Sequence, residues 1–168
     1  MYSMPQFSFS SCMFFLRLVI LEMVIYMKND CQMLSSILKT TQAGQISIQK
    51  VLDTSMRPGL RKALQSQLQE YNAIESDAYA LAAQRGWELQ EIQPGKRMVA
   101  GIMTGMKLSH GNSDSKIADM MIQNNTRGMI QGLKNLHQYQ QQDSQVSALS
   151  QRLLDCETAN IRQMQTFL

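Results

Sequence analysis

The chain has 168 residues and a formal net charge of +3, which is enough length for one domain with a buried core. Its basic residues are scattered without a Lys/Arg run, so we expect no nucleic-acid binding. Cys12, Cys31 and Cys156 form no close pair, which argues against a disulfide framework and a zinc site. Cys156 lies on an apolar helix face, so we expect a small buried hydrophobe there.

The first 26 residues differ from everything after them. Residues 12–26 read CMFFLRLVILEMVIY, which is shorter than the about 20 apolar residues of a membrane span and contains Arg17 and Glu22. No basic residue precedes this run and no small-x-small site follows it, so a secretory signal does not fit. Met27 resembles an ordinary cytosolic start. We interpret residues 1–26 as an upstream or non-native extension, with an apolar helix that packs or meets a membrane as the alternative, and 27–168 as a single helical bundle domain.

Two long helices follow, over about residues 30–54 and 57–87. Asn29 and Gln32 have the spacing of a capping box at the start of the first helix. Pro58 opens the second helix, because its missing N–H has no partner there anyway, and Gly86 can take the left-handed closing conformation. The short connection between the helices predicts an antiparallel hairpin.

The connection over residues 87–112 is too long for a hairpin, and a short helix is predicted within it at about 96–110. Two more helices follow, over about 114–141 and 144–167. The long connection could run the full length of the bundle, which gives a ferritin-like antiparallel four-helix bundle with one crossover. A kinked, continuous helix over 96–141 in a simple up-down bundle is the alternative. The third long helix is expected to bury Ala118, Ile122, Asn125, Met129, Leu133, Leu136 and Tyr139.

The second helix carries a resemblance. The segment from Leu60-Arg61-Lys62-Ala63-Leu64 to the closing Gln84-Arg85-Gly86-Trp87 resembles the spore coat protein F family, over about residues 30–90. The four-helix plan more broadly resembles the ferritin-like superfamily. The first resemblance implies a soluble bundle of a spore-forming bacterium, cytoplasmic or in the spore coat, with other spore coat proteins as partners. It implies no catalytic activity.

A ferritin-like di-iron centre needs Glu-x-x-His motifs that face inward, and the sequence has none. Lys134 stands three residues before His137, and the nearest match is Glu157-x-x-Asn160. We therefore expect no catalytic residue, no cofactor and no metal. A polar layer is nonetheless predicted near the helix midpoints, interpreted as hydrogen bonds that fix helix register, as a degenerate metal or ligand pocket, or as surface residues. Its members are Thr41 or Gln45 with Glu75, Asn125, Glu157 and Asn160.

Two glycine pairs lie within predicted helices, Gly101-x-x-x-Gly105 and Gly128-x-x-x-Gly132. Each helical Gly costs about 1 kcal/mol relative to Ala, so a close backbone approach is expected to offset that cost. The approach is either an intrachain contact of the short helix with the third long helix or a subunit interface. The second interpretation, with nearby Met residues, predicts a homo-oligomer, most simply a homodimer.

These features favour a non-catalytic structural or interaction bundle with no membrane span. The alternative is a ferritin-like metal-binding or oxidoreductase bundle with a degenerate di-metal site. A small-molecule binder that uses a Met-lined interior is a third, more remote hypothesis.

Overall fold

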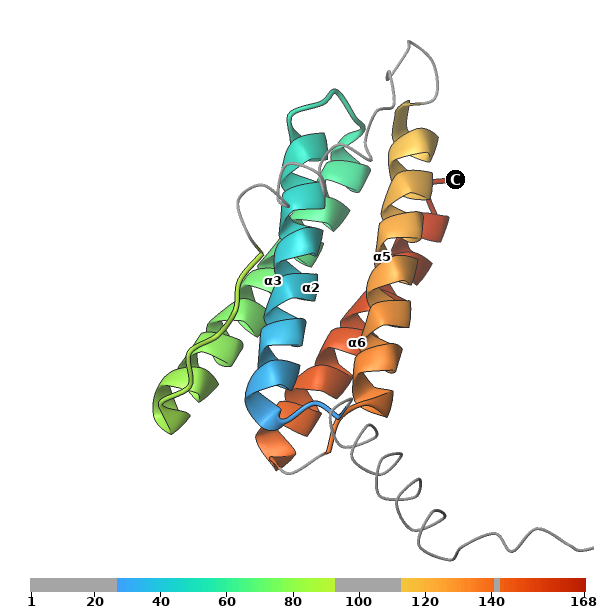
Figure 1. The fold of residues 1–168 in the computed structure, drawn as a ribbon. Helices are drawn as coiled ribbons and strands as arrows, with labels where there is room; N and C mark the ends of the chain where they lie inside the picture. The colour runs from blue at the N-terminus through green and yellow to red at the C-terminus, as the bar shows by residue number, and fades with distance from the viewer. Residues whose placement is uncertain (1–26, 93–112, 141–142) are drawn as a thin grey trace, which may run out of the picture.

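The computed structural model describes residues 27–92, 113–140 and 143–168, and these form a four-helix bundle (Figure 1). Its helices are α2 (Asp30–Leu52), α3 (Pro58–Arg85), α5 (Ser113–His137) and α6 (Ser144–Gln165). The predicted all-α four-helix bundle is confirmed. The extension over 1–26 and the short helix predicted at 96–110 lie outside the described residues. Within the described ranges, every helix is too short or too polar to cross a lipid bilayer.

The helix ends form where the local sequence predicts them. The Asn29 side chain accepts from the Gln32 N–H at 2.9 Å, and the Gln32 side chain accepts from the Asn29 N–H at 3.1 Å, which completes the capping box. Gly86 closes α3 with a φ of 66°. The Trp87 N–H then reaches the Ala82 carbonyl at 2.9 Å, which satisfies one of the last free carbonyls of the helix.

Contacts between helix ends fix the topology. Arg57 at the start of α3 forms an ion pair with Asp114 at the start of α5, so these two helices run in the same direction. At the opposite end, the Lys28 backbone pairs with Gln138 and Gln140, so α2 and α5 are antiparallel. The connection after α3 must therefore return along the whole bundle. The crossover topology is confirmed, and the up-down alternative is wrong.

The first part of this connection is itself described, and it runs beside α2 (Figure 1). The Gln90 N–H donates to the Ser35 hydroxyl at 3.1 Å, and the Ile92 N–H donates to the Gln42 side chain at 3.0 Å. Polar side chains of α2 thus hydrogen-bond directly to the backbone of this segment. They set the direction of the crossover from its first residues.

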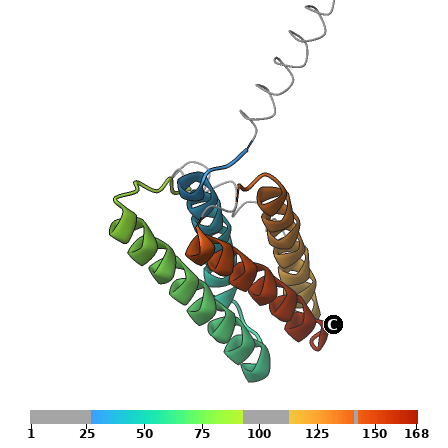
Figure 2. The same cartoon turned by 90° about the horizontal axis from the view of Figure 1, so that it is seen from below.

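Seen from below, α2 and α6 approach each other across the bundle, while α3 and α5 lie at opposite sides (Figure 2). The core is mostly aliphatic side chains and Met, among them Leu34, Leu64, Ile74, Met121 and Met164. Because α2 lies at the short diagonal, it contacts all three other helices.

The predicted inward face of α5 is partly wrong. Ala118, Asn125 and Tyr139 are buried as expected, but Leu133 is 53% exposed. Gly132 is buried in its place, against the Leu154 side chain of α6. Since glycine rather than leucine faces α6, the inward face is rotated by about one residue in this half of the helix. Ile122, Met129 and Leu136 are correspondingly only half-buried.

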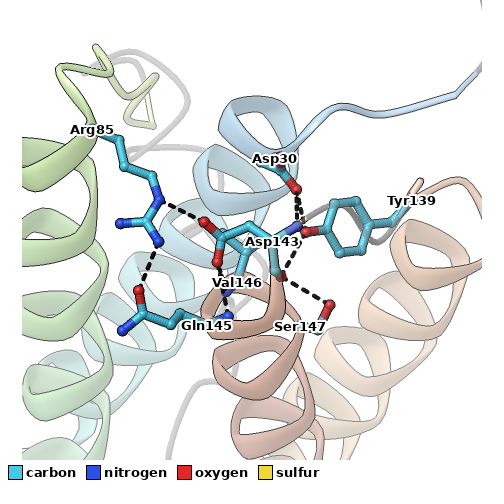
Figure 3. A network of polar contacts seen from close by, with 7 residues as sticks. All are labelled: Asp30, Arg85, Tyr139, Asp143, Gln145, Val146 and Ser147. Atoms are coloured by element: carbon cyan, nitrogen blue, oxygen red, sulfur yellow. Dashed lines mark hydrogen bonds and ion pairs between the residues drawn. The ribbon is translucent and has the colours of Figure 1, made fainter.

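One end of the bundle is closed by a polar network that the sequence analysis did not predict (Figure 3). The helix α5 ends at His137, four residues before the predicted 141, so Tyr139 lies in the turn that follows. The Tyr139 hydroxyl and the Asp143 N–H both donate to Oδ1 of Asp30, the latter at 3.0 Å. Asp143 also caps α6 and accepts from Arg85 Nε at 2.5 Å. We call Asp30, Arg85, Tyr139 and Asp143 the end network; it joins the ends of all four helices.

Candidate functional site

Near the middle of the bundle, Tyr71 of α3 is fully buried and joins three helices through its hydroxyl group. The hydroxyl donates to Oδ1 of Asn125 on α5 at 3.1 Å. It accepts from Nδ2 of Asn160 on α6 at 3.4 Å. The sequence analysis predicted both Asn residues as members of a polar layer, and the structure brings them together. The sequence analysis did not include Tyr71 in this layer and so missed the residue at its centre.

The helix α2 makes room for this layer at Gly44, which has no side chain. A Cβ atom on Gly44 would lie 2.6 Å from Cε2 and Cζ of Tyr71, closer than packed atoms approach. Tyr71 therefore crosses the face of α2 at Gly44 to reach α5 on the far side of the bundle. A glycine within a helical stripe is the sequence signal that predicts such a bulky neighbour. Its cost of about 1 kcal/mol in a helix is offset by the space it leaves.

Glu157 of α6 completes the layer. Its side chain is buried, with 2% of the residue exposed, and it fits against Gly128 of α5, where a Cβ atom would lie 2.5 Å from Oε1. Its Oε2 atom has no hydrogen-bond partner among the described residues. Burial raises the pKa of Glu157 to about 8, although hydrogen bonding by the neighbouring Tyr71 hydroxyl opposes the rise in part. Glu157 is therefore mostly a neutral carboxylic acid at pH 7.

Cys156 lies beside this layer and is buried, as the sequence predicts. Asn160 Nδ2 lies 3.5 Å from its sulfur atom. Burial, with the nearby Glu157 and Glu70 carboxyl groups, raises the pKa of Cys156 to about 12. The thiol is therefore protonated and a poor nucleophile at neutral pH. We define the core layer as Tyr71, Asn125, Glu157 and Asn160.

Glu75, another predicted member, lies outside the core layer. It is half-buried between α2 and α3, and it accepts from Gln42 Nε2 at 3.2 Å and from Gln45 Nε2 at 2.6 Å. Its carboxyl group thus stays near the surface, where two amide groups hydrogen-bond to it. Thr41 is buried, but its hydroxyl donates to the Ile37 carbonyl of its own helix at 2.9 Å. Neither residue contributes to the layer around Tyr71.

The glycine pair of α5 is used within the chain. Gly128 receives the Glu157 side chain and Gly132 receives Leu154, both from α6. The observed neighbour is therefore α6, whereas the predicted contact with the short helix at 96–110 lies outside the described residues. The pair Gly101 and Gly105 lies outside the described residues.

A groove of about 400 Å³ lies above Gly44 and Gly128, between α2 and α5. Glu157 belongs to its lining and is the contribution of α6. The positively charged residues of the lining are Lys39 on α2 and Arg127 on α5. The remaining lining residues are small or uncharged: Thr40, Ala43, Ser47, Asn124 and Gln131.

The donor set does not resemble a metal centre. Across residues 27–92, 113–140 and 143–168, no three His, Cys, Asp or Glu side chains are grouped so that they could hold a metal ion. His137 is exposed at the end of α5, far along the helix from Asn125, and His110 lies outside the described residues. The core layer supplies one carboxyl group, two amides and a phenol, which suit hydrogen bonding better than they suit iron or zinc.

No family model matches this chain, and no curated protein matches it. A solved structure is similar: the crystal structure of a DUF305 fragment from Deinococcus radiodurans, with a TM-score of 0.63 and 14% sequence identity. The match covers 82% of this chain and 93% of that one. At this identity the likeness shows the fold, a helical bundle. It gives no support to the resemblance to the spore coat protein F family.

Proposed function

We propose that this protein is a non-catalytic structural or interaction bundle of the spore-coat type, which acts in the cytoplasm or the spore coat by binding copies of itself and other coat proteins. The observation that carries the proposal is an apolar patch on the outer face of α5. Ile130 is 46% exposed and Leu133 is 53% exposed, and residues three apart lie on the same side of a helix. In a two-fold symmetric dimer, Ile130 and Leu133 of one copy can pack against the same two side chains of the other copy.

The core supports the same proposal. Its buried polar groups are hydrogen-bonded amides, a phenol and a carboxyl group that is mostly neutral at pH 7, while Cys156 is held as a thiol. Groups of this kind fix which helix faces meet and in which register. They provide neither a strong base nor an activated nucleophile, which suits a protein that assembles rather than one that catalyses.

The test is the mass of the protein in solution. We expect a dimer by light scattering at low micromolar concentration, and we expect Ile130→Glu or Leu133→Glu to give single chains, because each places charge in the apolar contact. Gln65→Glu is the matched control, since Gln65 is exposed on α3 and the substitution adds the same charge elsewhere. A wild-type mass of one chain over the accessible concentrations would remove the proposal.

The alternative is a metal-binding or oxidoreductase bundle with a degenerate di-metal site. It is favoured by one observation, the unpartnered Oε2 atom of Glu157 in the middle of a bundle with one long crossover. Metal analysis of the purified full chain decides between the two. Stoichiometric iron or manganese, without metal added during purification, would replace the first proposal with this one.

A further inference from the structure

The core layer has more hydrogen-bonding capacity than the described part of the chain uses. Oε2 of Glu157 and Nδ2 of Asn125 are buried, and within residues 27–92, 113–140 and 143–168 they have no hydrogen-bond partner. A buried polar atom without a partner costs about 1–3 kcal/mol. Such groups are therefore expected where a ligand or water completes the site.

The Glu157 side chain lines the groove between α2 and α5, so the groove leads from the surface to this buried carboxyl group. Gly44 and Gly128 belong to the lining of the groove, where they allow the Tyr71 ring and the Glu157 carboxyl group to approach the backbones of α2 and α5 closely. A volume of about 400 Å³ lies within the range of small-molecule sites.

Charge indicates which ligand the groove favours. Lys39 and Arg127 line its sides, and Lys39 Nζ also donates to Gln90 Oε1 at 3.1 Å. The other titratable groups that face the Glu157 carboxyl group are Tyr71 and Cys156, both of which are neutral at pH 7. With Glu157 protonated, the described residues of the lining carry two positive charges and no negative one.

We propose that the groove between α2 and α5 binds a small organic carboxylate, which accepts a hydrogen bond from the protonated Glu157 at its floor and lies between Lys39 and Arg127. The proton on Glu157 makes it a donor, so the ligand carboxylate and the side chain share one proton instead of repelling each other. A ligand amine would instead require Glu157 to ionise between two cationic residues. The groove therefore selects against amines of the same shape.

Benzoate is the probe, and benzylamine is the cation of matched shape. We expect benzoate to bind the full-length protein with a Kd on the order of 1 mM at about pH 6.5. Because binding requires the proton on Glu157, the Kd should rise about tenfold per pH unit above about pH 8. The carboxyl-carbon NMR signal of Glu157 should titrate at higher pH with benzoate present, which tests the site without any substitution.

Substitutions locate the site. Glu157→Gln keeps a neutral donor, so benzoate should bind within about threefold of wild type at about pH 6.5 and lose the pH dependence. Arg127→Gln should weaken binding by about fivefold or more, whereas Lys62→Gln, an exposed lysine on α3 outside the groove, should leave it unchanged. If Glu157→Gln fails to fold, the NMR titration of wild type and the benzoate affinity of Arg127→Gln still test whether the ligand binds in the groove.

Three results would overturn the proposal. They are no benzoate binding at concentrations of about 10 times the expected Kd, tighter binding of benzylamine than of benzoate, and a Glu157 signal whose titration ignores benzoate. The proposed dimer is tested only by the mass of the protein in solution, so its failure can be distinguished from a failure of the carboxylate site.

Discussion

The end network and the core layer are both polar and both join helices, yet they differ in charge and in completeness. In the end network, Asp143 caps α6 and pairs with Arg85, and Asp30 accepts two hydrogen bonds, so both carboxyl groups have donors (Figure 3). In the core layer, the carboxyl group is mostly neutral at pH 7 and two buried atoms have no partner among the described residues. The charged groups thus lie at the end of the bundle, where water helps to solvate them, whereas the buried carboxyl group at the centre is mostly neutral.

This difference implies that the two regions respond to pH in opposite directions. Burial alone would raise the pKa of Asp143, but hydrogen bonds from Arg85 and from the N–H groups of Gln145 and Val146 lower it below its ordinary value. The stability from Asp143 is therefore present at neutral pH and lost in acid. The pKa of Glu157 is raised, so its folded state holds the proton more tightly and is favoured at low pH.

The largest expected effect is the loss of stability as Glu157 ionises. Its pKa lies at about 8 in the folded protein and at 4.5 ordinarily, so the free energy of unfolding should fall between pH 5 and pH 8. The contribution of this one group is on the order of 3–4 kcal/mol. Urea unfolding at several pH values measures it.

Glu157→Gln is the matched variant for this prediction, because it replaces the neutral acid with a neutral amide of similar size. Its free energy of unfolding should be nearly flat over the same pH range. A wild-type curve that is already flat would show that the pKa of Glu157 is not raised by folding, and a slope that persists in the variant would show that other groups cause the pH dependence.

The next largest effect on stability is expected at Gly44, where the Tyr71 ring lies against the backbone of α2. In Gly44→Ala the new methyl group would lie 2.6 Å from the Tyr71 ring, which must shift and lose its bond to Asn125. We expect a destabilisation of about 2 kcal/mol, although Ala is the better helix former by about 1 kcal/mol. Thermal unfolding followed by circular dichroism measures it.

Gly59→Ala is the control, because Gly59 is exposed near the start of α3 and a Cβ there would make only an ordinary contact with Phe167 at 3.7 Å. It should not destabilise the protein. Equal effects at the two positions would mean that Gly44 tolerates a side chain and that Tyr71 is not confined by α2.

A smaller effect is expected for Asn125→Leu. The substitution removes the acceptor for the Tyr71 hydroxyl, worth about 1 kcal/mol, and also removes the unpartnered Nδ2 atom. The apolar area gained offsets part of the loss, so stability should change by no more than about 2 kcal/mol in either direction. Metal content should be zero in both proteins. A bound ion that disappears in the variant would favour the metal-binding alternative.

The sequence predicts the parts of this molecule that depend on local chemistry. Capping by Asn29, the start at Pro58 and the end at Gly86 each need only neighbouring residues, and each is confirmed. The length of the connection after Trp87 favoured the crossover, because a chain of that length can run the whole bundle, and the contacts between helix ends then excluded the up-down alternative. Asn125 and Asn160 were predicted from their positions near the helix midpoints.

The missed features depend on which helix faces meet. Tyr71 could not be placed at the centre of the layer, because only the assembled bundle shows that Gly44 makes room for its ring. Leu133 was assigned to the core by hydrophobicity, although Gly132 faces α6 more closely. The end network joins residues far apart in sequence, such as Asp30 and Tyr139, and no local pattern marks that contact.

The smallest expected effect is at the end network, and it tests the contrast with the core layer most directly. Arg85 is 28% exposed in its side chain, so water screens its pair with Asp143 and its loss costs little. We expect Arg85→Gln to lower the free energy of unfolding at pH 7 by about 1 kcal/mol or less. The same variant should lose less stability than wild type on acidification through the Asp143 titration, because Arg85 is one cause of the lowered pKa. Urea unfolding at pH 7 and at about pH 3 measures both quantities, with Arg162→Gln, an exposed arginine of α6, as the control.

If Arg85→Gln instead destabilises the protein as much as Gly44→Ala does, the end network stabilises the fold as strongly as the core layer. The division between a screened, charged end and a buried, neutral centre would then be wrong.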